Sequence, residues 1–207
     1  MSLGSVAYSP LMHNRPVRGK GISGPTYRVE RKAYRGVQST VEHMVRFITE
    51  GQTHPDVRNV AIAAVKDVYP HDYTSELAAI FYDACRRVRY VRDPANAEML
   101  HQPHLSLRTG AGDCDDLAVL LGALVKSREP RKMNAVLGAL AAAVGAPVQV
   151  VTAGFESKNG PHSHTFLRVW DSRKGSWIVL DPVAGPFTQE MVSRTTNYRA
   201  VDIGRKG

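Results

Sequence analysis

The sequence predicts an α+β fold, in which helices from the first two thirds of the chain pack on an antiparallel sheet formed by the last third. Apolar residues recur at helical spacing between residues 40 and 144. Between Val148 and Leu180 they gather instead in short segments rich in β-branched residues. Helices that precede strands, rather than alternate with them, are typical of α+β domains.

Three helices are expected before residue 90. The first runs from about Thr40, with apolar residues at i, i+3, i+4 and i+7, and stops at Gly51. The second begins at Pro55, because proline is favoured in the first helical turn, and ends before Pro70. The third starts near Ser75 and carries an apolar stripe opposite a solvated arginine face.

The helix that follows has the sharpest predicted start. Residues 90–107 look irregular, because Pro94 and Pro103 interrupt them. Asp113 is then a favourable N-cap, which makes Cys114 the first helical residue of an apolar helix. Asp115 and Asp116 fall in its first turn, where carboxylates are favoured by the helix dipole.

The last third of the chain is expected to form the sheet. A further helix, Lys132 to about Val144, comes first. Strands are then predicted over Val148–Ala153, Thr165–Trp170 and Trp177–Leu180, and the polar segment 172–175 is the hairpin turn between the last two.

The charge is concentrated at the N-terminus. The net charge is +8, and residues 1–36 hold seven basic residues and one acidic residue, so six of the eight net charges lie there. This segment has no periodicity and is interpreted as a basic arm, whereas the nearly neutral body argues against a surface built to bind nucleic acid. No apolar run reaches the roughly 18 residues of a membrane span, and no signal-peptide pattern opens the sequence, so no membrane association and no signal-directed secretion are expected.

Cys114 is the candidate nucleophile. Two cysteines are too few for a disulfide framework, and Cys85 lies mid-helix, where an inert core thiol is expected. A thiolate at a helix N-terminus gains about 0.3–1 kcal/mol from the dipole, which the three neighbouring aspartates oppose. Cys114 therefore needs a cationic partner such as histidine, or else it is only a buried small residue.

Hairpin geometry supplies that partner. If Asp171 pairs with Ser176 across the turn, His164 lies diagonal to Asp181 on the same face of the sheet. Diagonal neighbours are about 7–8 Å apart, within reach of an imidazole–carboxylate hydrogen bond. Cys114, His164 and Asp181 are therefore predicted as a catalytic triad, although Asp181 could instead cap a turn before Pro182.

Other residues near this site are weaker candidates. His162 is expected at a loop or strand edge, and Gln102 is a weak candidate for the second donor to an oxyanion, beside the backbone N–H of Cys114. A metal site built from the aspartates and the two histidines is not favoured, since carboxylates adjacent on one helical turn point in different directions. No metal and no cofactor are therefore predicted.

At these residues the sequence resembles the transglutaminase-like superfamily, whose core is related to papain-like thiol enzymes. The resemblance covers roughly Val41 to Pro182 and is closest to short members encoded by tailed bacteriophages and prophages. It rests on three features, namely Gly112-Asp113-Cys114-Asp115-Asp116 opening an apolar helix, His164 opening a strand, and Trp177-Ile178-Val179-Leu180-Asp181-Pro182. It divides the chain into the arm 1–36, a domain 37–187 with a helical insertion at about 126–144, and a tail 188–207.

The resemblance implies a thiol-dependent acyl-transfer enzyme, a peptidase, amidase or transglutaminase-like acyltransferase, that acts on a protein or peptide. It also implies a place in a phage virion or in the host cytoplasm. The alternative is a virion or tail protein that keeps the fold, binds other phage structural proteins through residues 1–36, and leaves the triad idle. Nucleic-acid binding by the arm rests on charge alone, and tyrosines among arginines suit protein interfaces equally well.

Overall fold

The computed structural model describes residues 27–29, 37–69, 72–94, 98–127, 147–155, 161–183, 185–186 and 197–204. The helices in these ranges are α1 (Val37–Gly51), α2 (Pro55–Val65), α3 (Tyr73–Arg87), α4 (Pro103–Thr109) and α5 (Cys114–Lys126). The strands are β1 (Tyr27–Val29), β2 (Arg89–Tyr90), β3 (Glu98–Leu100), β4 (Ala111–Gly112), β5 (Val148–Gly154), β6 (His164–Asp171), β7 (Ser176–Asp181), β8 (Gly185–Pro186) and β9 (Asn197–Asp202).

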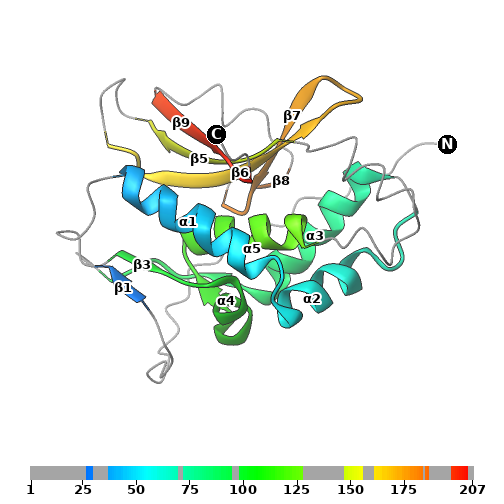
Figure 1. Cartoon of the computed structure of the whole chain (residues 1–207), viewed down its shortest axis with the longest axis horizontal. Coiled ribbons are helices and arrows are strands. Elements are labelled where there is room, and N and C mark those ends of the chain that lie inside the picture. The colour runs from blue at the N-terminus through cyan, green and yellow to red at the C-terminus, as the bar shows by residue number, and fades with distance from the viewer. Residues whose placement is uncertain are drawn as a thin grey trace.

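The molecule has two layers, helices on one side and a sheet on the other (Figure 1). The sheet has five strands in the order β8-β7-β6-β5-β9, and every neighbouring pair is antiparallel. Helix α5 packs against β6 and against α1, α3 and α4. The α+β class is confirmed, with the helices on one face of the sheet.

Helix α5 is the centre of the core. Its residues from Leu117 to Leu124 are almost completely buried on all sides, as expected for a helix enclosed by two layers. Gly122 permits the close approach of α1, because a Cβ at this position would lie 2.7 Å from a side-chain carbon of Ile48. The helix that begins with Cys114 is therefore held rigidly, which is what a precisely positioned functional group requires.

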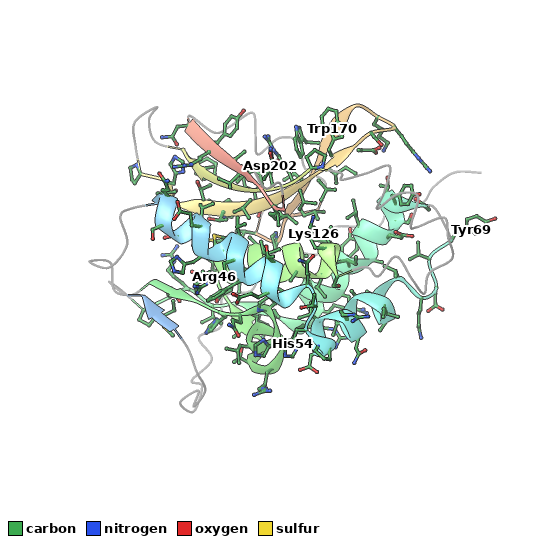
Figure 2. The ribbon with its side chains drawn as sticks, in the orientation of Figure 1. Arg46, His54, Tyr69, Lys126, Trp170 and Asp202 are labelled. Atoms are coloured by element: carbon green, nitrogen blue, oxygen red, sulfur yellow. The ribbon has the colours of Figure 1, made fainter. Side chains whose placement is uncertain are left out.

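Both faces of the sheet bury apolar side chains. Val150, Leu167 and Leu180 belong to the main core with the helices, whereas Val151 and Phe166 belong to a second, smaller cluster. The alternation along each strand assigns these two sets to opposite faces. Figure 2 shows Trp170, which alternates with Val169, on the side of the sheet away from the helices.

Three elements differ from the sequence-based expectation. Residues 197–202, assigned above to a C-terminal tail, form edge strand β9 and pair with β5. Residues 103–109, within the segment expected to be irregular, form α4, which Pro103 begins and Gly110 ends at φ 64°. Residues 27–29, assigned to the arm, form β1 and pair with β3.

The remaining expectations fall partly outside the described residues. The rest of the arm, residues 128–144 of the helical insertion, and most of the tail lie there. Within the ranges given above, no helix has the length and apolarity needed to cross a bilayer.

Candidate active site

Cys114 occupies the first position of α5, as predicted. Asp113 is the N-cap, and its carboxylate accepts hydrogen bonds from the backbone N–H groups of Asp115 at 3.0 Å and Asp116 at 3.2 Å. These bonds satisfy two of the N–H groups that a helix start leaves without partners. The backbone N–H of Cys114 has no intrahelical acceptor at this position, so it is available to an incoming oxygen atom.

His164 and Asp181 form the predicted hydrogen bond. The hairpin has the predicted register, with Asp171 opposite Ser176 and Leu167 opposite Leu180. Nε2 of His164 lies 2.7 Å from Oδ2 of Asp181. Because an ionised carboxylate only accepts, Nε2 carries the hydrogen, and Nδ1 is left as the free ring nitrogen.

The carboxylate of Asp181 is fixed from two sides. Its Oδ1 accepts the backbone N–H of Val183 at 2.9 Å, while Oδ2 holds the His164 ring. Asp181 is completely buried and the His164 side chain is 10% exposed. The rings of Phe155 and Phe166 flank the imidazole, with centroids 6.2 and 6.1 Å from it. These contacts fix both the tautomer and the orientation of the imidazole.

The start of α5 and the start of β6 meet at the Cys114 sulfur. The backbone N–H of Thr165 faces this sulfur atom and acts to lower the pKa of Cys114. Thr165 is the residue directly after His164, so the first turn of α5 lies against the start of β6. The structure thus shows two separate contacts, one between Thr165 and Cys114 and one between His164 and Asp181.

The electrostatic surroundings of Cys114 favour the neutral thiol. Burial is the main cause that raises the pKa of Cys114, and the negative charges of Asp115 and Asp113 raise it further. The hydrogen bond from Thr165 acts in the opposite direction, because it stabilises the thiolate. The opposing effect of the aspartates, expected from the sequence, is therefore present, and the thiol must lose its proton to a base when it reacts.

Replacing Asp115 with asparagine should make Cys114 more reactive. The thiol donates to Oδ1 of Asp115 at 3.5 Å, so neutralising this carboxylate removes a negative charge next to the sulfur and lowers the Cys114 pKa. Each unit by which the pKa falls gives tenfold more thiolate and a nucleophilicity about threefold lower, a net gain of about threefold below the pKa. The measurement is the rate of alkylation by iodoacetamide at pH 8, followed by peptide mapping. Asp67→Asn, an exposed substitution in the loop after α2, is the control, and an unchanged Cys114 rate would contradict the expectation.

The other candidates from the sequence make different contacts. Nδ1 of His162 lies 2.7 Å from the hydroxyl oxygen of Thr152, which fixes this ring without a carboxylate. Gln102 is the N-cap of α4 and makes no side-chain capping bond. Burial, with a smaller contribution from the Asp181 charge, raises the pKa of Cys85 to about 11. Of the two cysteines, Cys114 is the one with a helix N-terminus and a backbone donor at its sulfur.

A second histidine–aspartate pair lies beside the start of α5 and was not predicted. Asp116 Oδ1 accepts the backbone N–H of His101 at 2.6 Å, and its Oδ2 lies 2.6 Å from Nδ1 of the same residue. Asp116 is completely buried and His101 is 8% exposed. The segment that contains His101 was expected to be irregular, because two prolines interrupt it and its sequence has no periodicity. The pair is therefore identified only by the contact between distant segments in the folded chain.

Within the part of the chain that the structure describes, no group of three or more His, Cys, Asp or Glu side chains is arranged to hold a metal ion. The carboxylate of the N-cap Asp113 accepts backbone N–H groups, that of Asp115 accepts the Cys114 thiol, and that of Asp116 bonds His101.

Solved structures share this arrangement of helices and sheet. A candidate protease from Parabacteroides distasonis superposes with a TM-score of 0.54 at 12% sequence identity, over 84% of this chain. The two chains share a fold. This chain spans 31% of the length of that protein, so the likeness concerns the fold and not the whole protein. It confirms the predicted helix-on-sheet core.

Two further structures are similar at lower scores. LapG from Legionella pneumophila has a TM-score of 0.45 at 15% identity, and covers 75% of this chain and 77% of its own. A candidate cysteine protease from Cytophaga hutchinsonii has a TM-score of 0.43 at 14% identity, and covers 81% of this chain and 57% of its own. No protein-family profile and no curated protein sequence matches this chain.

Proposed function

We propose that this chain is a thiol-dependent acyl-transfer enzyme, a peptidase or amidase or a transglutaminase-like acyltransferase, with Cys114 as nucleophile, His164 as base and Asp181 as the orienting carboxylate. The observation that supports the proposal is the position of Cys114 at the N-terminus of α5, where the backbone N–H of Thr165 acts on its sulfur, while His164, the residue before Thr165, is held by the buried carboxylate of Asp181. The protease-like fold agrees with this assignment but does not test the residues.

The first half of the reaction forms an acyl-enzyme. Nδ1 of His164 takes the thiol proton as the sulfur attacks the substrate carbonyl carbon, and Asp181 stabilises the imidazolium that forms. The carbonyl oxygen becomes an oxyanion that accepts the backbone N–H of Cys114. When the C–N bond breaks, the leaving amine takes the proton from Nδ1, and a thioester to Cys114 remains.

The second half releases the acyl group. Water or an amine attacks the thioester carbonyl, and Nδ1 takes the proton of this nucleophile. The C–S bond then breaks and the sulfur leaves, recovering its proton from the imidazolium. A thiol with a raised pKa suits this sequence, because the proton is transferred during attack and the resting enzyme does not need a permanent thiolate.

The test combines hydrolysis and transfer in one assay. The full chain is incubated with a proteome-derived peptide library in water enriched in oxygen-18, with and without methylamine. We expect new peptide termini that carry one heavy oxygen if water resolves the acyl-enzyme, or new methylamides if the amine does. A chain that produces neither, while its melting temperature shows that it is folded, would refute the proposed function.

We also propose that residues 1–36 bind neighbouring protein subunits of a phage or prophage particle, which places the chain in a virion or in the host cytoplasm. The support is the concentration of net charge in this segment and the resemblance described above. The test is replacement of Arg15, Arg18 and Lys20 by glutamate. We expect the variant chain to be lost from purified particles, and incorporation equal to the unmodified chain would exclude this role.

A further inference from the structure

The pair formed by His101 and Asp116 lies directly beside the proposed nucleophile. Asp116 is in the first turn of α5, two residues after Cys114, whereas His101 is in the connection between β3 and α4. Two hydrogen bonds of 2.6 Å join them, one from the backbone of His101 and one from its ring. The pair therefore ties a separate segment of the chain to the turn that carries Cys114.

Helix capping alone does not account for the position of the Asp116 carboxylate. Its carboxylate also accepts the backbone N–H of Asp113, which completes a capping box, but this bond is 3.4 Å long. The carboxylate of Asp113 already caps the helix through two shorter bonds. The short bonds of Asp116 go to His101, so its geometry is set by the histidine and not by the cap.

The backbone beside Asp116 leaves room for its contact with His101. A Cβ on Gly112 would lie 2.6 Å from Cβ of Asp116 and 2.9 Å from its Oδ2, so only glycine lets the carboxylate reach His101. Gly112 is itself held by parallel pairing of β4 with β2. The backbone on both sides of the carboxylate is thus fixed.

The charges around His101 favour its protonated form. The hydrogen bond to Asp116 is the main cause that raises the His101 pKa, and the negative charges of Asp116 and Asp93 add to it, while burial opposes them. Nε2 of His101 is buried and has no hydrogen-bond partner within the described ranges, where the ring bonds through Nδ1. The titratable groups next to the pair are Asp93, Asp113, Asp115 and Cys114.

A buried ion pair seldom stabilises a fold more than apolar side chains of the same volume would. Stability alone therefore explains the pair of His101 and Asp116 poorly. Its position at the turn that carries Cys114 suggests that it serves the site. We propose that His101 is a positioning residue for Cys114, acting through Asp116 to hold the first turn of α5, so that the sulfur and the backbone N–H of Cys114 keep the geometry that acyl transfer requires. This inference rests on the proposed function.

Two variants separate positioning from general stability. His101→Leu keeps much of the volume but removes the ring donor, which leaves Asp116 with one short bond and one long bond. His101→Asn places a side-chain N–H close to the former Nδ1 and keeps the bond without a titratable ring. Ser106→Ala, which removes a buried hydroxyl that has no partner, is the matched control in α4.

The first measurement is the alkylation rate of Cys114 by iodoacetamide from pH 6 to pH 10, at a temperature well below unfolding of every variant. We expect His101→Leu to lower the alkylation rate of Cys114 about tenfold and to shift its pH profile to higher pH. The alkylation rate of Cys85 should stay unchanged and serves as the internal reference. His101→Asn should restore the rate to within about threefold. Equal rates for His101→Leu and the unmodified chain, or an asparagine variant as slow as the leucine variant, would overturn the inference.

The second measurement does not depend on activity. Amide hydrogen exchange in the peptide that spans residues 112–118 should accelerate about tenfold in His101→Leu and stay near the unmodified value in His101→Asn and Ser106→Ala. Unchanged exchange in His101→Leu would overturn the inference even in an active enzyme. Conversely, a chain that hydrolyses no peptide but shows this exchange pattern would refute the proposed function and leave the positioning role standing.

Discussion

Cys114→Ala should abolish the proposed activity, with a loss of at least about 10³-fold in kcat for peptide hydrolysis or amine transfer. The substitution removes the sulfur that forms the thioester, and no other described nucleophile has both a helix N-terminus and a backbone donor at its reacting atom. The measurement is the rate of new-terminus formation in the isotope-labelled assay. Little change in the melting temperature is expected, because the lost side chain is small and partly exposed.

The matched control for this prediction is the other cysteine. Cys85→Ala removes a thiol of the same chemistry from α3, where burial raises its pKa to about 11. This variant should keep its activity within about threefold, because the Cys85 thiol takes no part in the proposed steps. Activity that survives Cys114→Ala and disappears in Cys85→Ala would reverse the assignment of the nucleophile.

The parts of this site that were predictable from sequence depend on local rules. Asp113 followed by Cys114 opens a helix, because a capping side chain and a first-turn carboxylate act within four residues of one another. The bond between His164 and Asp181 follows from a four-residue turn that fixes the register of a hairpin. Each of these inferences needed only the spacing of neighbouring residues along the chain.

The parts that were missed depend on contacts between distant segments. His101 reaches Asp116 because α4, which follows His101, packs against α5, and no periodicity in residues 90–107 indicates this. Edge strand β9 pairs with β5 across about 50 residues of sequence, and its pattern of alternate half-exposed residues is weak. Short elements at an edge are defined by their partner rather than by their own sequence, which explains why both were assigned to irregular chain.

The two histidine–aspartate pairs differ in which ring nitrogen the carboxylate holds. Asp181 holds His164 through Nε2 and leaves Nδ1 unbonded by any described residue, whereas Asp116 holds His101 through Nδ1, and Nε2 of His101 is buried with no partner among the described residues. A base must exchange its proton with the thiol and with the substrate, so a free nitrogen at the site of reaction is required. His164 meets this requirement, and His101 is suited to holding structure.

Asp181→Asn should lower kcat by about 10² to 10⁴-fold while KM changes little, because the carboxylate acts on the imidazole and not on the substrate. The asparagine keeps the size of the side chain, but it carries no charge to stabilise the imidazolium, and its amide can favour the wrong histidine tautomer. The fold should survive, since the buried charge of Asp181 is itself costly and its replacement is nearly isosteric. Kinetics with one cleaved peptide, together with the melting temperature, measure both effects.

The control for this prediction is Asp202→Asn in edge strand β9 (Figure 2), where the carboxylate accepts a hydrogen bond from Gln149 and takes no part in the proposed steps. This change should leave kcat within about twofold. A variant Asp181→Asn that is folded and retains full kcat would show that the bond from His164 to Asp181 serves only the fold. If the activity falls in Asp181→Asn and persists in Asp202→Asn, the loss belongs to the imidazole that Asp181 orients and not to a weakened sheet.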